Sequence, residues 1–224
     1  GLDIENFPFA AIKPIEIAGK TVTAFRISYV GEQGWELHMP YEDGLAVWDA
    51  LRETGIMAMG VETYANSRRL EKSLRLQNAD LHTQYNLIEA ALARPKVKEA
   101  DFRGKAKHLE FKAREHQPAM LCTLVMNDNI DSQGVARYPV NTMPVMDPET
   151  DEVLIDSLGR RSYTTSQAFG PSVGKNIMLA YLPHEYCEVG RKLKVTYFDE
   201  PFEVEVAGVG YAPLYDPENL KPRS

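Results

Sequence analysis

The stretch ISYVGEQGWELHMP, residues 27–40, predicts the second strand of a β-hairpin and its turn. β-Branched and aromatic residues run from Val22 to Val30, two glycines mark a turn at 31–34, and a strand resumes at Trp35 until Pro40 ends it. A four-residue loop at 31–34 would pair Tyr29 with Glu36 and place both on one face of the ribbon, about 5 Å apart at Cβ.

A phenol and a carboxylate on one face could form a ligand site. An ionised Glu36 offers two acceptor oxygens and no donor, which suits a ligand edge with two adjacent N–H groups, such as a 2-amino-4-oxopteridine. Tyr29 could orient a neighbouring acid or relay a proton. The alternative is an edge glutamate bonded to the tyrosine hydroxyl with no ligand, and the hairpin geometry alone leaves both open.

Helical spacing follows the hairpin. Leu45, Trp48 and Leu51 predict an amphipathic helix over 42–54, with Gly55 just past its end. A second helix is expected from Gly60 to about Leu74, and a third from Gly104 to about Arg114. The front of the chain is therefore expected to be α+β.

From Pro118 onward the pattern is that of short strands. Apolar or alternating segments lie at 119–126, 145–146, 153–155, 177–182, 193–198 and 202–209, with turn residues between them. Such spacing predicts a small barrel or sandwich. We expect an α+β domain at 1–116, an all-β domain at 117–224, and an extended terminus from Tyr215 to Ser224.

The composition excludes several classes of protein. The chain has 224 residues, 44% of them hydrophobic, and a net charge of −7, which argues against a nucleic-acid binder. No apolar run is long enough to predict a membrane span. The first residues have neither a basic nor a long apolar region, so we expect no signal peptide and a cytoplasmic location. Because the sequence starts with Gly1 rather than Met, we expect processing or a subcloned piece.

Common catalytic and metal motifs are absent from the sequence. The five histidines form no pair at i, i+4, so no metal site is expected. Cys122 and Cys187 lie 65 positions apart among apolar neighbours, which predicts buried free thiols in a reducing compartment.

Five segments, in order, resemble the glycine-cleavage T-protein (aminomethyltransferase) family. Residues 27–40 resemble its strand–turn–strand, and residues 46–55 (AVWDALRETG) follow at the usual distance. The others are SRRLEKSLRL (67–76), NLIEAALARPKVKEADFRGKAKHL (86–109) and TSQAFGPSVGKNIMLAYLP (165–183), with EVGRKLKV (188–195) fitting the closing hairpin. Ala65 stands where T-proteins proper often carry Arg. The chain is thus more similar to the C-terminal portion of dimethylglycine and sarcosine dehydrogenases.

The resemblance implies a fold and an activity. The fold would be a partial ferredoxin-like folate-binding domain followed by a small all-β barrel. The chain would be the tetrahydrofolate-binding part of an aminomethyltransferase or N-methyl amine demethylase. It would pass a one-carbon unit from a small N-methyl amine or aminomethyl donor to tetrahydrofolate, giving 5,10-methylenetetrahydrofolate. A flavin would lie only on an N-terminal region absent here or on a partner flavoprotein.

The resemblance also assigns residues. Glu36 matches the pteridine-binding glutamate. Tyr29 matches a tyrosine that hydrogen-bonds the catalytic aspartate, which lies in a segment preceding Gly1. Phe169 matches an aromatic near the folate, the alternative being a loop aromatic buried in the barrel. The other interpretation of the chain is a non-catalytic folate-binding or interaction subunit of a multi-chain flavin-dependent amine oxidase.

Two further groups of side chains have competing interpretations. Arg68, Arg69 and Arg75 could neutralise the glutamyl tail of a folate. More often such residues form a solvated helix face, here with Glu71 and Arg75 as an i, i+4 pair. The two tryptophans, Trp35 and Trp48, are expected in the core.

Overall fold

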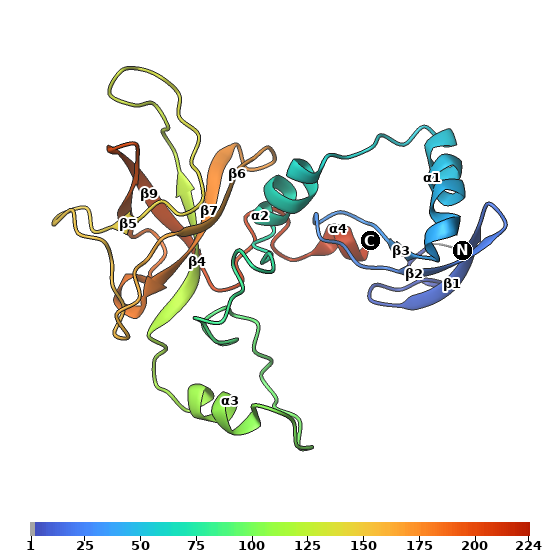
Figure 1. The fold of residues 1–224 in the computed structure, drawn as a ribbon, viewed down its shortest axis with the longest axis horizontal. Coiled ribbons are helices and arrows are strands. Elements are labelled where there is room, and N and C mark those ends of the chain that lie inside the picture. The colour runs from blue at the N-terminus through green and yellow to red at the C-terminus, as the bar shows by residue number, and fades with distance from the viewer. Residues whose placement is uncertain (1–2) are drawn as a thin grey trace.

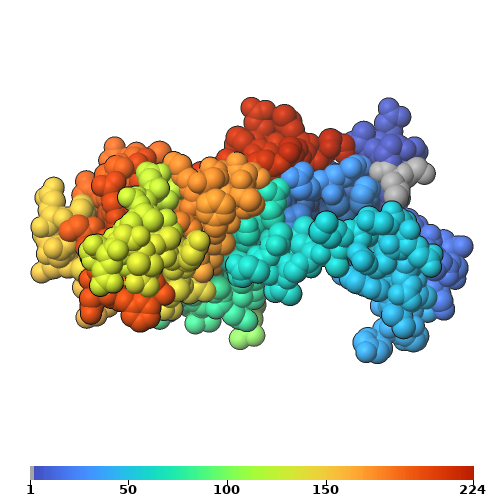
Figure 2. Space-filling model, turned by 90° about the horizontal axis from the view of Figure 1, so that it is seen from above, coloured from blue at the N-terminus to red at the C-terminus, as the bar shows by residue number. Residues whose placement is uncertain are grey.

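The computed structural model describes residues 3–224. A small N-terminal sheet with a helix lies at one end of the molecule and a β-barrel at the other, with helical turns and the C-terminal segment between them (Figure 1). Seen from above, residues near 60–80 join the two ends, and the C-terminal segment lies over the join (Figure 2). The expected α+β class with a following barrel is confirmed.

The first hairpin forms as its sequence predicts. Strand β1 (Ile12–Ile17) pairs antiparallel with β2 (Lys20–Phe25), and the intervening Ala18 and Gly19 both have positive φ, as tight hairpin turns require. Alternation along β2 buries Val22 and Ala24 completely, while their neighbours face outward.

The second hairpin differs from the prediction. β2 ends at Phe25, and β3 (Glu36–His38) pairs with it in a register that sets Phe25 opposite Glu36. The chain leaves the ladder because the buried Arg26 exchanges backbone hydrogen bonds with Ala10 and Ala11 instead. Residues 26–35 therefore form a long connection, and the predicted pairing of Tyr29 with Glu36 is wrong.

Gly31 in this connection could not be another residue. Its φ is +75°, and a Cβ built on it would lie 2.5 Å from the side-chain carbons of Lys72. The connection thus packs directly on the side chain of Lys72.

The helices match the predicted segments, with shifted ends. The 3₁₀ turn η1 (Tyr41–Asp43) leads into α1 (Gly44–Glu53), and Gly55 with φ +87° follows it. The expected helix at 60–74 is a π-helix, η2 (Glu62–Arg68), that continues as α2 (Arg69–Glu71) and ends there. α3 (Lys105–Lys112) lies where the third helix was expected. Short helices η3 (His184–Tyr186) and α4 (Leu220–Arg223) complete the set.

The barrel is a six-stranded antiparallel sheet in the order β5-β8-β9-β4-β7-β6. Its strands are β4 (Ala119–Met126), β5 (Val145–Met146), β6 (Thr164–Gly170), β7 (Lys175–Pro183), β8 (Lys192–Tyr197) and β9 (Glu200–Val209). Backbone hydrogen bonds between 142–145 and 162–164 join its two edges and close it. Buried apolar side chains fill the interior, Leu124, Met178, Leu193 and Val204 among them.

A second apolar core crosses the predicted boundary at residues 116 and 117. Leu70 of α2 and Ala90 pack with Leu121, Ile177 and Leu179 on the outside of the barrel. The two predicted domains therefore share buried surface, and the boundary between them stays a prediction.

The C-terminal tail is not the extended terminus that its prolines suggested. It folds back over the connection at 26–35, where the carbonyl of Ser224 accepts hydrogen bonds from the side chains of Arg26 and Gln33. Leu220–Arg223 is helical. The prediction failed because the tail is ordered by contacts almost two hundred positions away in sequence, which no local pattern shows.

Candidate functional site

The π-helix η2 lies at the centre of the predicted site residues. Tyr64, in its first turn, stacks at a tilt on Tyr29, with ring centroids 5.4 Å apart. The Tyr29 hydroxyl donates to the carbonyl oxygen of Arg75 at 2.9 Å, and burial raises the pKa of this half-buried phenol. Tyr29 is thus held by backbone, not by Glu36, and the alternative of a Tyr29–Glu36 bond is also wrong.

The charge of Glu36 acts on Tyr64. Burial raises the pKa of Tyr64, and the negative charge of Glu36 raises it further. The Glu36 side chain is 44% exposed, and its Oε2 lies 3.7 Å from Nε2 of His38. Its carboxylate oxygens therefore remain available to a donor from solvent or from a ligand.

Phe169 lies on the barrel side of the same helix. It stands on β6 with half of its surface exposed, and its carbonyl oxygen accepts a hydrogen bond of 2.8 Å from the Ser67 hydroxyl. The alternative in which Phe169 is buried inside the barrel is therefore wrong. Ser67 follows Tyr64 by three positions on η2. η2 thus contacts Tyr29 through Tyr64 and Phe169 through Ser67, and the charge of Glu36 acts on the same helix at Tyr64.

Tyr64 is the residue that sequence reasoning missed. The sequence indicated Tyr64 only weakly. The indication is its position one helical turn before Ser67, the first residue of the motif SRRLEKSLRL. A π-helix widens the turn, and such turns occur frequently at functional sites. Tyr64 is 42% exposed, so its ring offers a face to a ligand as well as to Tyr29.

The tryptophans do not both lie in the core. Trp48 on α1 is 53% exposed, which contradicts its prediction, because Val47 rather than Trp48 faces the small sheet. Trp35 is half-buried, edge-on to Phe7 at 6.3 Å and beneath the guanidinium of Arg26 at 5.5 Å.

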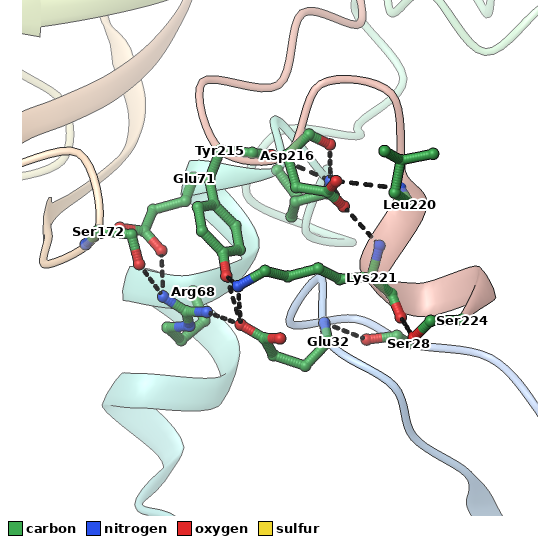
Figure 3. Close-up of polar contacts among 11 residues, drawn as sticks. Ser28, Glu32, Arg68, Glu71, Ser172, Tyr215, Asp216, Leu220, Lys221 and Ser224 are labelled. Atoms are coloured by element: carbon green, nitrogen blue, oxygen red, sulfur yellow. Dashed lines mark hydrogen bonds and ion pairs between the residues drawn. The ribbon is translucent and has the colours of Figure 1, made fainter.

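Arg68 is neither solvated nor free to bind a glutamyl tail. Its guanidinium bonds Glu71 and Glu32, each at 2.6 Å, and the Ser172 hydroxyl at 2.5 Å. It also lies 4.9 Å from the ring centre of Tyr215, whose hydroxyl donates to Glu32 at 2.8 Å (Figure 3). Arg68 therefore ties the helix to the N-terminal connection, the barrel and the tail.

The tail has a second anchor on the same helical segment. The Lys72 ammonium donates to the backbone carbonyls of Tyr215 and Asp216, at 3.0 and 2.6 Å. The Asp216 carboxylate in turn accepts from the amide of Leu220, which begins α4 (Figure 3). These bonds fix the tail beside the candidate site.

Arg69 and Arg75 have structural partners as well. Arg69 pairs with Asp80 and bonds Ser166, and Arg75 donates to the carbonyls of Ser73 and Ala90. The predicted Glu71–Arg75 pair does not form, since Glu71 bonds Arg68 and the amide of Ser172. The solvated-face interpretation is wrong, because both arginines are buried.

A hollow of about 980 Å³ lies away from these residues. It opens between the segment 85–99 and α3, with apolar walls that include Leu87, Phe102 and Phe111 and with lysines and arginines at its margin. It includes none of the three nominated residues.

Residues 3–224 show neither a cluster of metal ligands nor a membrane-spanning helix. No group of three or more His, Cys, Asp or Glu side chains is placed to hold a metal ion. No helix in this part of the chain is long and apolar enough to cross a membrane.

Comparison with known proteins gives consistent matches. The family model "GCVT N-terminal domain" matches residues 1–97, and "Glycine cleavage T-protein C-terminal barrel domain" matches residues 140–216. Human mitochondrial dimethylglycine dehydrogenase is 32% identical over 98% of this chain and 23% of its own length. An aminomethyltransferase of Exiguobacterium sibiricum is 31% identical over 92% of this chain and 50% of its own.

A solved structure shows the same fold. The crystal structure of glycine cleavage system aminomethyltransferase T from Bartonella henselae superposes with a TM-score of 0.75 at 20% identity, covering 94% of this chain and 54% of that one. The chain thus spans between about a quarter and a half of the length of the relatives it matches.

Proposed function

Because this chain belongs to the glycine-cleavage T-protein family, we propose that it is the tetrahydrofolate-binding part of an aminomethyltransferase or N-methyl amine demethylase. The reaction would pass a one-carbon unit to tetrahydrofolate and give 5,10-methylenetetrahydrofolate. The observation that carries the proposal is that η2 contacts Tyr29 through Tyr64 and Phe169 through Ser67, while the charge of Glu36 acts on Tyr64.

The residues fit such a ligand in two ways. Glu36 has exposed acceptor oxygens, as the paired N–H groups of a pterin edge require. Tyr64 and Phe169 are aromatic and half-exposed, so they can cover the faces of planar rings. When bound, tetrahydrofolate supplies the nucleophilic amine that accepts the one-carbon unit.

The part played by this chain would be positioning. Glu36 would orient the pterin by two hydrogen bonds, and the stacked tyrosines would hold it in place, so that catalysis draws mainly on orientation. Tyr29 is a positioning residue in this scheme. Its hydroxyl proton is donated to the Arg75 carbonyl, and burial raises the pKa of the phenol.

The test is a calorimetric titration with tetrahydrofolate. The wild-type chain should bind, and Glu36→Gln should weaken binding by about 1–3 kcal/mol, the scale of a charged hydrogen bond. Glu16→Gln, the same change on the exposed side of β1, is the matched control and should leave affinity unchanged. Equal affinity of wild type and Glu36→Gln would remove the assigned role of Glu36.

A second function is favoured by a different observation. Large apolar side chains are exposed along 41–61, including Tyr41, Leu45, Trp48, Met57 and Val61. Such exposure is typical of surfaces that pack on another protein. We therefore retain the alternative of an interaction subunit of a flavin-dependent amine oxidase. Absence of tetrahydrofolate binding by the wild-type chain, together with co-purification with a flavoprotein, would favour it.

A further inference from the structure

The two cysteines of the sequence, 65 positions apart, meet in the barrel. Cys122 lies in the middle of β4, fully buried in the barrel core. Cys187 directly follows η3 and is half-buried. Their sulfur atoms are 3.8 Å apart, within contact distance but unbonded. The predicted free thiols are thus present, but one of them is only half-buried and the two face each other.

The two thiols have different environments. The Cys122 S–H donates to the sulfur of Cys187, an interaction that raises the pKa of Cys122 and lowers that of Cys187. Burial adds to the rise at Cys122. Cys187 is therefore the better nucleophile and the more accessible thiol, whereas Cys122 lies beside it in the barrel core.

The surrounding backbone allows the sulfurs to approach. Cys122 is fixed, since β4 is hydrogen-bonded to β7 on one side and β9 on the other. Cys187 belongs to a short turn, tied mainly through the amide of His184 to the carbonyl of Pro118 and through its own amide to His184. A disulfide needs the sulfurs at about 2 Å, so the turn must supply the remaining movement.

We propose that Cys122 and Cys187 form a reversible intramolecular disulfide when the chain meets a peroxide. The Cys187 thiolate attacks one oxygen of hydrogen peroxide, and the other oxygen leaves as hydroxide, which gives a sulfenic acid. The Cys122 thiol attacks that sulfur, loses its proton and displaces the second oxygen as water. Two thiols and one peroxide thus yield one disulfide and two waters.

The disulfide would link the turn after η3 to β4, near the point where the chain enters the barrel. The turn that carries Cys187 also holds His184, whose ring stacks on that of His116 at 4.0 Å, just before β4 begins. Joining Cys187 to β4 closes a long loop, which restricts the unfolded chain. The oxidised form should therefore melt at a higher temperature than the reduced form.

The experiment uses the purified chain, treated with hydrogen peroxide or with dithiothreitol. After peroxide, both thiols should be lost to a thiol reagent under denaturing conditions, the intact mass should fall by two hydrogens, and peptide mapping should join Cys122 to Cys187. Dithiothreitol should restore both thiols. Persistence of both thiols, a disulfide between two chains, or a mass gain of oxygen without a cross-link would each overturn the proposal.

Single variants test the division of roles. In Cys122→Ser, Cys187 should be trapped as a sulfenic acid by dimedone. In Cys187→Ser, the remaining Cys122 should stay unreactive while the chain is folded, as circular dichroism would verify. Faster reaction of Cys122 than of Cys187 would contradict the assignment. If either variant fails to fold, the rate of thiol loss at each cysteine in the wild type, read by peptide mapping, decides the same point.

Discussion

Arg69 and Asp80 form an ion pair of 2.7 Å in which neither side chain has any exposed surface. Arg69 also donates to the Ser166 hydroxyl, and the Thr165 hydroxyl donates to Asp80, both from β6. The pair thus joins the helical segment that adjoins the candidate site to the barrel. Every partner is needed, because a buried charge that loses its counter-ion keeps its full desolvation cost.

Arg69→Leu should therefore destabilise the chain strongly. We expect a loss of about 3–5 kcal/mol in the free energy of unfolding, measured by urea denaturation. Lys192→Gln is the control, since it removes ion pairs of a half-exposed lysine with Glu203 and Glu205 on the barrel surface and should cost at most about 1 kcal/mol. Equal losses in the free energy of unfolding of the two variants would show that the buried Arg69–Asp80 pair stabilises the chain no more than an exposed pair does.

Replacement of Tyr64 should affect folate binding through its ring. Under the proposed function, Tyr64→Leu should weaken tetrahydrofolate binding by about 2- to 10-fold, the scale of one aromatic stacking contact. Tyr64→Phe keeps the ring and should bind nearly as the wild type does. Tyr41→Leu, at a fully exposed tyrosine, is the control. Weak binding by Tyr64→Phe would assign the contribution to the hydroxyl instead.

Loss of Arg68 should release the C-terminal tail. In Arg68→Leu, hydrogen exchange of residues 215–224 should accelerate, because the links to Glu32 and to the Tyr215 ring disappear. Glu32→Gln removes only the charge of the half-exposed Glu32 that Arg68 binds. It should therefore accelerate exchange less than Arg68→Leu does. Barrel amides in β4 provide the internal control. An unchanged tail in Arg68→Leu would mean that the contacts with Lys72, Arg26 and Gln33 hold it without Arg68.

Stability should decline at high pH through Tyr85. Burial raises its pKa to about 12, against about 10 in an unfolded chain, although the nearby Arg160 opposes the rise. The folded state therefore keeps a proton that the unfolded state releases, so the stabilisation is complete below about pH 10 and is lost as pH approaches 12. Burial also raises the pKa of Tyr181, which adds a contribution of the same sign.

Urea denaturation between pH 8 and pH 11 would show this decline. Tyr85→Phe should make it shallower, because its ring can still stack on Tyr181, at 3.5 Å between centroids, but can no longer ionise. An identical pH dependence in wild type and Tyr85→Phe would contradict the assignment. Tyr138→Phe, at an exposed position, is the matched control.

The sequence predicted most elements because their signals are local. The alternation at Leu193, Val195 and Tyr197 gave β8, and the spacing of apolar residues gave the helix at 42–54. β6 was not predicted as a strand, since Thr164, Thr165 and Ser166 are polar. Thr165 and Ser166 are buried with Asp80 and Arg69 as hydrogen-bond partners, and the Thr164 hydroxyl bonds the backbone of Met143 and Val140. For the same reason the charged helix at 60–74 looked solvated, although its arginines are buried.

The family motifs nominated Tyr29, Glu36 and Phe169, but the reason for grouping two of them was wrong. The expected hairpin register would have paired Tyr29 with Glu36 directly. Instead, Arg26 leaves the ladder and sends the chain through a long connection, and Tyr64 from a later helix becomes the shared neighbour. The alternation of inward and outward side chains describes a single strand. It does not show that this strand will end because a buried arginine, Arg26, hydrogen-bonds another segment of the chain.

The sequence by itself determined the class of fold, most of its strands and helices and the resemblance to the glycine-cleavage T-protein family, because periodicity and motifs depend on neighbouring residues. Tertiary structure alone decided the return of the tail onto Arg26 and Arg68, the burial of Arg69 with Asp80, and the approach of Cys122 to Cys187. Each of these joins segments far apart in the chain. Their energies come from desolvated charges and shared hydrogen bonds, which exist only once the two segments have met.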